Sequence, residues 1–534
     1  MPQPWWRNAV FYEVYVRSFA DSDDDGIGDL PGITSHLEHI RDLGADAIWL
    51  TPFYPSPQKD HGYDVSDYFD VNPEYGTLED FDRLLARAHE LHLKVLVDIV
   101  PNHTSDQHAW FRDAVSAPDN PFRERYHFAD PKPGGAPPNN WTSSFDGPAW
   151  SPEPAGKQWY LHLFAPEQPD LNWWNPAVPT EFERILQFWL NRGADGFRID
   201  VAGALFKRRD LEDRPFLVDP ISGLPKFDSD FAIVDQPPLH DVYRRWRQIA
   251  NAYEPARVLV GEIFDPRRHA KYIVPDQLHM AFALIHQRWD AGLWRRSIEN
   301  SRRALQGPGA GPTWTLSNHD VVRPVTRLGG GTVGRARARA ALLLLLGLPG
   351  QVFLYQGEEL GLEEADMPDS ARQDPIFFRT KGRLKGRDGC RVPLPWRRGR
   401  PNAGFSNGSP WLPMPVGWDR FAVDAQEGSG DSILAHFRRG LAARRRLGSR
   451  LPDRIDWLRT PDGVLAYARG PLVVACNFLS RPARLRLQGR LEAASEPLVA
   501  EKAGILHLPP NAAAWLLRVA RPRQADGQSD LTSA

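Results

Sequence analysis

The chain has 534 residues, of which 42% are hydrophobic and 25% are charged, and its formal net charge is −2. These values are ordinary for a soluble globular protein, and the length suffices for one large domain with smaller ones attached. The balanced charge gives no electrostatic basis for nucleic acid or an anionic membrane as a partner.

The sequence lacks the features of membrane and secretory proteins. Its most apolar run, residues 341–348, is far shorter than the roughly 20 residues that a membrane helix needs. The first residues contain no charged and then apolar leader. Cys390 and Cys476 are far apart, which argues against a disulfide framework or a cysteine metal site. We therefore expect a cytoplasmic protein.

Eight short β-like runs recur along the chain, and most of them follow a helix-like stretch. The helix-like segments 33–43 and 78–93 precede the second and third runs. Strands that alternate with helices indicate a parallel sheet, and eight of them favour a closed (β/α)8 TIM barrel of the α/β class. The runs cover residues 9–16, 46–52, 94–103, 196–201, 256–264, 279–285, 312–320 and 350–359.

Three parts of the chain depart from this alternation. The connection after the third run is too long for an unstructured loop. Residues 104–171 are therefore predicted to form an inserted subdomain, with residues 1–103 and 172–450 forming the catalytic barrel. Residues 451–520 contain short alternating runs typical of an antiparallel β-sandwich. The polar residues 521–534 are expected to form a flexible tail.

The acidic segment DSDDDGIGDL, residues 21–30, has the ligand spacing of the start of an EF-hand loop. Asp21, Asp23, Asp25 and the Ile27 carbonyl fall at alternating positions, and calcium prefers such clustered oxygen atoms. The twelfth position is Gly32 rather than Glu, and the segment follows a predicted strand, so a complete EF-hand is excluded. A solvated acidic turn is the alternative interpretation.

Polar residues stand at the ends of several predicted strands, which form the mouth of the active site in a TIM barrel. Because strand side chains alternate between faces, Arg198 and Asp200 share one face. The arginine is expected to keep Asp200 ionised by lowering its pKa. Carboxyl groups in different environments perform glycoside hydrolysis. The residues are His103, Arg198, Asp200, Glu262, His319 and Asp320, and Asp98 is expected to support its strand end.

Four segments resemble glycoside hydrolase family 13, the α-amylase family, in the family's order and on the expected strands. They are DIVPNH (98–103), GFRID (196–200), GEIF (261–264) and SNHD (317–320). The resemblance covers nearly the whole chain. It implies that Asp200 is the nucleophile, that Glu262 is the general acid/base, and that Asp320 stabilises the transition state.

The same resemblance implies the roles of the neighbouring side chains. His103 and His319 would hydrogen-bond the sugar in the innermost subsite, and Arg198 would orient Asp200. The family retains the anomeric configuration through a covalent glycosyl-enzyme, which agrees with a two-step scheme.

Further segments resemble the branch of α-glucosidases and oligo-1,6-glucosidases. The branch signature QPDLNW (168–173) places Phe164 and Gln168 in the pocket, and Phe145 is a further expected wall. KDHGYD (59–64) supplies Asp60 and Tyr63.

The segment GRDGCRVPLPW (386–396) resembles the one whose arginine pairs with that aspartate. We assign this arginine to Arg391 in preference to Arg387. The pair would close the pocket behind a terminal glucose, which implies exo action. In this branch the acidic loop is a structural calcium site, with Asp29 as a further ligand.

The linkage preference stays open in the sequence. Val201 follows the nucleophile as in oligo-1,6-glucosidases, yet Val201 with Gly203 also resembles bacterial α-1,4-glucosidases. We expect a retaining exo-acting α-glucosidase that takes short α-glucosides such as maltose, with some transglucosylation. The alternatives are an oligo-1,6-glucosidase, a trehalose synthase or a sucrose isomerase. A non-enzymatic transporter subunit with this barrel is disfavoured, because all three carboxylates are present.

Overall fold

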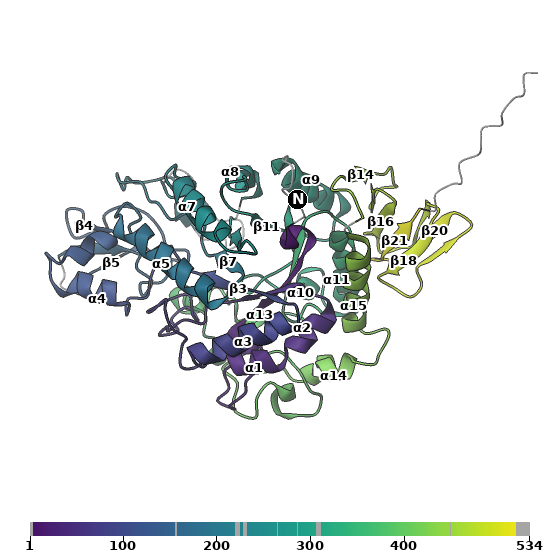
Figure 1. Ribbon diagram of the computed structural model, residues 1–534, viewed down its shortest axis with the longest axis horizontal. Coiled ribbons are helices and arrows are strands. Elements are labelled where there is room, and N and C mark those ends of the chain that lie inside the picture. The colour runs from purple at the N-terminus through teal and green to yellow at the C-terminus, as the bar shows by residue number, and fades with distance from the viewer. Residues whose placement is uncertain are drawn as a thin grey trace, which may run out of the picture.

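Eight strands rich in aliphatic and aromatic residues form a closed parallel barrel at the centre of the molecule (Figure 1). Each strand pairs with its neighbour in chain order, and the last pairs with the first, so the predicted TIM barrel is confirmed. The strands are β1 (Val10–Val14), β2 (Ala47–Leu50), β3 (Lys94–Ile99), β7 (Gly196–Ile199), β10 (Val258–Gly261), β11 (Met280–Leu284), β12 (Thr313–Thr315) and β13 (Gln351–Tyr355). The fold comes from a computed structural model that describes residues 4–154, 157–218, 225–227, 232–263, 265–285, 287–305, 311–448 and 450–518.

Helices connect the barrel strands. The predicted helix at residues 33–43 is divided at His36, whereas the third strand is preceded by one continuous helix with a Thr77–Asp80 capping box. The helices are α1 (Leu30–Ser35), α2 (Leu37–Leu43), α3 (Leu78–Glu90), α5 (Ala177–Arg192), α7 (Leu239–Asn251), α8 (His269–Tyr272), α9 (Ala291–Ala304), α10 (Pro324–Arg327) and α11 (Gly331–Leu346).

The long connection between β3 and β7 carries structure of its own. It contains α4 (Ala109–Ser116) and a three-stranded sheet in the order β4 (Phe128–Ala129), β6 (Trp159–Leu161) and β5 (Trp150–Pro152). An antiparallel backbone bridge between His103 and Asp170 joins the two ends of the connection to each other. These elements lie within residues 104–171, at the left of Figure 1.

The connection after β7 contains a hairpin that the sequence patterns did not indicate. Its strands are β8 (Phe216–Val218) and β9 (Pro225–Phe227), which pair antiparallel. The segment before the hairpin contacts the inserted residues, since Asn139 Nδ2 donates to Leu211 O at 2.9 Å and Trp141 Nε1 donates to Glu212 O at 3.0 Å.

The segment after β13 runs through the short helices α12 (Pro375–Arg379), α13 (Asp388–Arg391) and α14 (Val423–Gln426) to the longer α15 (Ile433–Gly448). It has few regular elements, and the side chains of α13 and of the residues before it reach the carboxyl ends of the barrel strands. Among the described residues, none of the helices combines the length and the apolar character that crossing a bilayer requires.

The C-terminal strands form two antiparallel sheets, at the right of Figure 1, which confirms the predicted β domain. Tyr467 Oη and Trp515 Nε1 donate to carbonyl oxygens of α11 at 2.7 and 2.9 Å and so dock this domain on the barrel. One sheet is ordered β14 (Asp456–Trp457), β15 (Val464–Arg469), β16 (Leu472–Asn477), β21 (Ala513–Leu517) and β18 (Arg490–Ala494), and the other β17 (Ala483–Arg486), β20 (Ile505–Leu508) and β19 (Ala500–Lys502). Residues 521–534, predicted as a flexible tail, lie outside the described residues.

Candidate active site

One arginine links three carboxyl groups at the ends of adjacent strands. Arg198 Nη1 lies 2.6 Å from Asp200 Oδ1 and 3.2 Å from Asp98 Oδ1, and its Nη2 lies 2.8 Å from Glu262 Oε1. Asp98 on β3 and Arg198 on β7 are paired residues of these two adjacent parallel strands. Because their side chains point to the barrel interior, the guanidinium group stands between the carboxyl groups. Asp98 also accepts hydrogen bonds from Trp49 and Tyr63, in agreement with a supporting role.

Burial controls the charge of this cluster. The side chains of Arg198, Asp98, Asp200 and Glu262 are 1%, 0%, 9% and 10% exposed. Burial raises the pKa of Asp98 to about 7 and raises the pKa of Asp200, against the opposing effect of Arg198. Arg198 lowers the pKa of Asp200 as expected, but desolvation by burial outweighs the ion pair, so the net pKa of Asp200 in the free site is raised. Burial is thus the largest influence on the pKa of Asp98 and on that of Asp200, and the shared guanidinium group of Arg198 opposes it at both.

Val201, directly after Asp200, has a strained backbone. Its φ of 46° lies in the left-handed region, which β-branched residues rarely adopt. Its backbone N–H donates to Glu262 Oε2, with the nitrogen 3.0 Å from the oxygen. Glu262 is thus held from two sides, by Arg198 and by Val201, and backbone strain is typical of functional sites.

Asp320 lies on the loop after β12 and is surrounded by positive groups. Its Oδ1 is 2.8 Å from Arg391 Nη2 and 3.2 Å from Arg387 Nη1. Burial alone would raise the pKa of Asp320, but the neighbouring His319, Arg387 and Arg391 side chains outweigh burial and lower it. Asp320 is therefore a carboxylate at neutral pH.

The ring of His319 is fixed on both faces. It stacks on Tyr15 and Tyr63 with centroid distances of 5.6 and 5.3 Å. Its Nδ1 lies 2.5 Å from Glu13 Oε1, a buried carboxyl group at the end of β1. Sequence reasoning missed Glu13, because a single acidic residue in an apolar strand carried no motif.

The structure corrects the assignment of the arginine that pairs with Asp60. Arg387 Nη2 lies 2.7 Å from Asp60 Oδ1, whereas Arg391 binds Asp320 and donates to the His319 carbonyl at 2.9 Å. The reason is that buried Asp374 contacts Arg387 Nε at 2.7 Å and turns its guanidinium group toward Asp60. Gln168 Nε2 donates to the second Asp60 oxygen at 3.2 Å.

The remaining predicted pocket residues join the same network. His103 Nε2 lies 3.0 Å from the Tyr63 carbonyl and 3.1 Å from Gln168 Nε2. Phe164 packs 5.2 Å from the His103 ring, and Phe145 packs 5.8 Å from Phe164. The structure therefore brings all the predicted catalytic and substrate-binding side chains around one site.

A buried ion pair behind His103 was missed from the sequence. Lys207 Nζ lies 2.7 Å from Asp170 Oδ1 and 2.7 Å from Asn102 Oδ1, and neither charged side chain is exposed. Asn102 Nδ2 in turn lies 3.1 Å from His103 Nδ1. The available signal was a lysine at the end of the apolar run VAGALFK.

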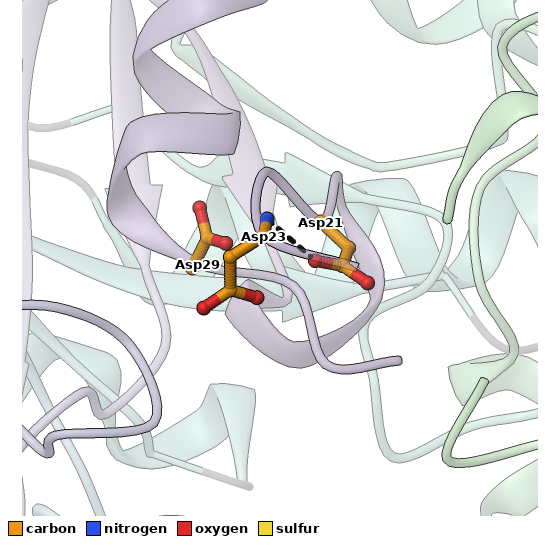
Figure 2. A group of neighbouring side chains, drawn as sticks. All are labelled: Asp21, Asp23 and Asp29. Atoms are coloured by element: carbon orange, nitrogen blue, oxygen red, sulfur yellow. Dashed lines mark hydrogen bonds between the residues drawn. The ribbon is translucent and has the colours of Figure 1, made fainter. Parts of the chain in front are cut away.

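The acidic loop after β1 gathers three carboxylates, shown in Figure 2. Asp21, Asp23 and Asp29 each place an oxygen within 4.8 Å of the others, which fits the hard oxygen ligands that calcium prefers. The structure does not bring Asp25 into this group; its carboxylate accepts a hydrogen bond from the Ile27 N–H at 2.7 Å. Asp29 caps α1 through the Gly32 N–H.

Comparison with known proteins agrees with the barrel and its site. The model of the family described as alpha amylase, catalytic domain, matches residues 13–449. The chain belongs to the α-amylase family. It is 42% identical over 491 residues to a probable alpha-glucosidase of Rhizobium meliloti (strain 1021), which covers 89% of each chain.

Two other relatives place this α-amylase family member in the branch predicted from its sequence. An oligo-1,6-glucosidase of Heyndrickxia coagulans is 38% identical, over 81% of this chain and 84% of the relative. A crystal structure of an alpha-glucosyl transfer enzyme, XgtA, is 39% identical with a TM-score of 0.90, covering 96% of this chain and 100% of that one. The predictions of the family, of its α-glucosidase branch and of a glycoside hydrolase are confirmed.

Proposed function

We propose that the protein is a retaining, exo-acting α-glucosidase that releases α-glucose from the non-reducing end of short α-glucosides such as maltose. The observation that carries the proposal is the single guanidinium group of Arg198, which contacts both Asp200 and Glu262. Two carboxyl groups bridged in this way are near one another, as the separation of about 5 Å in retaining glycosidases requires.

In the first step, Asp200 attacks the anomeric carbon while Glu262 donates its proton to the glycosidic oxygen. The carbon–oxygen bond breaks, the aglycone leaves as an alcohol, and an ester forms between glucose and Asp200. In the second step, Glu262 takes a proton from water, the water oxygen attacks the same carbon, and Asp200 leaves as a carboxylate. Two inversions at one carbon return the α configuration.

The remaining groups bind the terminal glucose. Ionised Asp320 accepts hydrogen bonds from ring hydroxyl groups and stabilises the positive charge that develops at the anomeric carbon. His103 and His319 hydrogen-bond hydroxyl groups of the same glucose. The Asp60–Arg387 ion pair closes the far end of the pocket, so one glucose unit fits before the scissile bond.

The same chemistry permits transfer when a sugar hydroxyl replaces water in the second step. The name of the related XgtA structure, an alpha-glucosyl transfer enzyme, supports some transglucosylation by this chain. Val201 beside Glu262 is compatible with α-1,6 as well as α-1,4 linkages, and the oligo-1,6-glucosidase relative keeps that alternative open. Trehalose synthase and sucrose isomerase are the remaining alternatives.

Proton NMR of the purified protein with maltose, and separately with isomaltose, tests the proposal. We expect α-glucose to appear from maltose before its β anomer. Faster release from isomaltose would assign an oligo-1,6-glucosidase, and trehalose in place of glucose would assign an isomerase. Early release of β-glucose would contradict the retaining mechanism.

The acidic loop is proposed to bind a structural calcium ion through Asp21, Asp23 and Asp29. Its position between β1 and α1, apart from the Arg198 cluster, favours a role in stability. A cytoplasmic location is also part of the proposal, because both cysteines remain buried free thiols.

A further inference from the structure

A turn of the inserted residues forms one edge of the pocket. Phe145 packs against Phe164, and its ring lies under the guanidinium group of Arg387 at 5.0 Å. Ser143 Oγ accepts a hydrogen bond from the Phe145 N–H at 3.0 Å and donates to Phe164 O at 2.7 Å. Asp146, the next residue, has a φ of 78°, and its carbonyl oxygen accepts a hydrogen bond from Arg379. Because Phe145 and Asp146 are consecutive in this turn, we expect the groups that hold Asp146 to help position Phe145.

Two arginines from the segment after β13 hold Asp146. Arg379 donates to its carbonyl through Nε at 3.0 Å and through Nη2 at 2.5 Å. Arg383 Nη2 lies 2.9 Å from its carboxylate Oδ2. The fork of Arg379 fixes direction as well as distance, which a lysine cannot reproduce.

The segment that carries these arginines is held together at its two ends by Asp374. Asp374 caps α12 through the Ile376 N–H, and its other oxygen accepts hydrogen bonds from the backbone and side chain of Arg387. Arg379, Arg383 and Arg387 follow one another at intervals of four residues, and all three contact the turn at Phe145 and Asp146. Arg387, which pairs with Asp60 at the closed end of the pocket, thus contacts the turn at Phe145, while Arg379 and Arg383 hold the same turn at Asp146.

The geometry points to Arg379 and Arg383 as positioning residues that clasp the turn at Asp146 and so set the affinity of the closed end of the pocket for a terminal glucose. This inference rests on the proposed function, since it names what the closed end binds. Loosening the clasp lets Phe145 move away from Arg387, which stays held by its ion pairs to Asp60, Asp320 and Asp374. The Arg198 cluster on the barrel strands is unaffected. Binding of glucose then weakens equally in the ground state and in the transition state.

The test compares Arg379→Ala/Arg383→Ala with the native protein. We expect KM for maltose and the inhibition constant for glucose to rise together by roughly three- to tenfold, with kcat changed less than about twofold. For Arg379→Lys, KM and the inhibition constant should lie between those of the native protein and those of the double variant. The matched control is Lys385→Ala, which removes an exposed ion pair to Asp369 in the same segment without touching Asp146.

Unchanged KM and inhibition constants would overturn the inference, as would a rise in KM for maltose without a rise for glucose, because the clasp would then act on the aglycone. If the double variant folds poorly, Arg383→Ala alone replaces it, since that side chain is 59% exposed. Calorimetric titration with glucose measures the same affinity without turnover. A native protein that binds glucose but cleaves no glucoside would therefore contradict the proposed function while the clasp could still be tested.

Discussion

The buried pair of Lys207 and Asp170 offers a sharp test of how the pocket is supported. Lys207→Met removes the ammonium group. Among the described residues, the unexposed Asp170 carboxylate then keeps its hydrogen bonds from Leu163 N and Asn102 Nδ2 but has no positive partner. Removing one partner of a buried ion pair typically destabilises a protein by about 3–5 kcal/mol. We expect a loss of this order, and a higher KM because Asn102 also contacts His103.

The chain contains a matched control with nearly the same contact distance. Lys132 Nζ lies 2.8 Å from Asp213, but these side chains are 43% and 54% exposed. Lys132→Met should therefore cost less than about 1 kcal/mol. Thermal unfolding of the two variants, followed by circular dichroism, compares the losses directly.

A double variant separates charge from packing. Lys207→Met/Asp170→Asn contains no unpaired charge, so it should regain a large part of the lost stability. Equal losses for Lys207→Met and Lys132→Met, or no recovery in the double variant, would refute the argument that an uncompensated buried charge causes the effect.

Three further predictions concern the catalytic groups, a buried acid and the acidic loop. Asp200→Asn should abolish glucose release while leaving the thermal midpoint within a few degrees, and retained activity would remove Asp200 from its proposed role. Burial raises the pKa of Glu358 to about 7, so its folded pKa exceeds the unfolded value of about 4.3 and native stability falls as pH rises between these values. The difference in thermal midpoint between Glu358→Gln and the native protein should therefore shift in favour of the variant when the pH is raised from 5 to 8. A difference in midpoint that does not change with pH would contradict this prediction. Removing calcium with a chelator should lower the native midpoint, and Asp23→Ala should abolish that response; equal responses in both proteins would place the ion elsewhere.

The barrel was predictable because its physical signals are local. Parallel strands that are buried on both faces appear in the sequence as short apolar runs. A strand such as KVLVDI can therefore be identified from its own residues, without knowing which strands pair with it. The hairpin of β8 and β9 was missed because three-residue strands are too short to show alternation. The break at His36 was missed for a related reason, since apolar spacing continues across both helices.

The predictability of the site residues also depended on whether they lie on barrel strands or on a loop. Asp98, Arg198 and Glu262 belong to adjacent strands or their ends, so the side-chain alternation of strands and the order of a barrel suffice to bring them together. Arg387 and Arg391 stand on a loop and a one-turn helix, where no period fixes the direction of a side chain.

Asp374 decides between those two arginines, and it lies thirteen residues before Arg387. Its carboxylate caps α12 and holds Arg387, so one buried acid sets both the course of the loop and the direction of the guanidinium group. Arg391 is then left to bind Asp320, and the two arginines together keep that carboxylate ionised. Asp98 and Asp200 share one arginine and burial raises the pKa of each, whereas Asp320 contacts two arginines and its pKa is lowered. The number of arginines that each of these three acids contacts therefore agrees with the opposite directions in which their pKa values move.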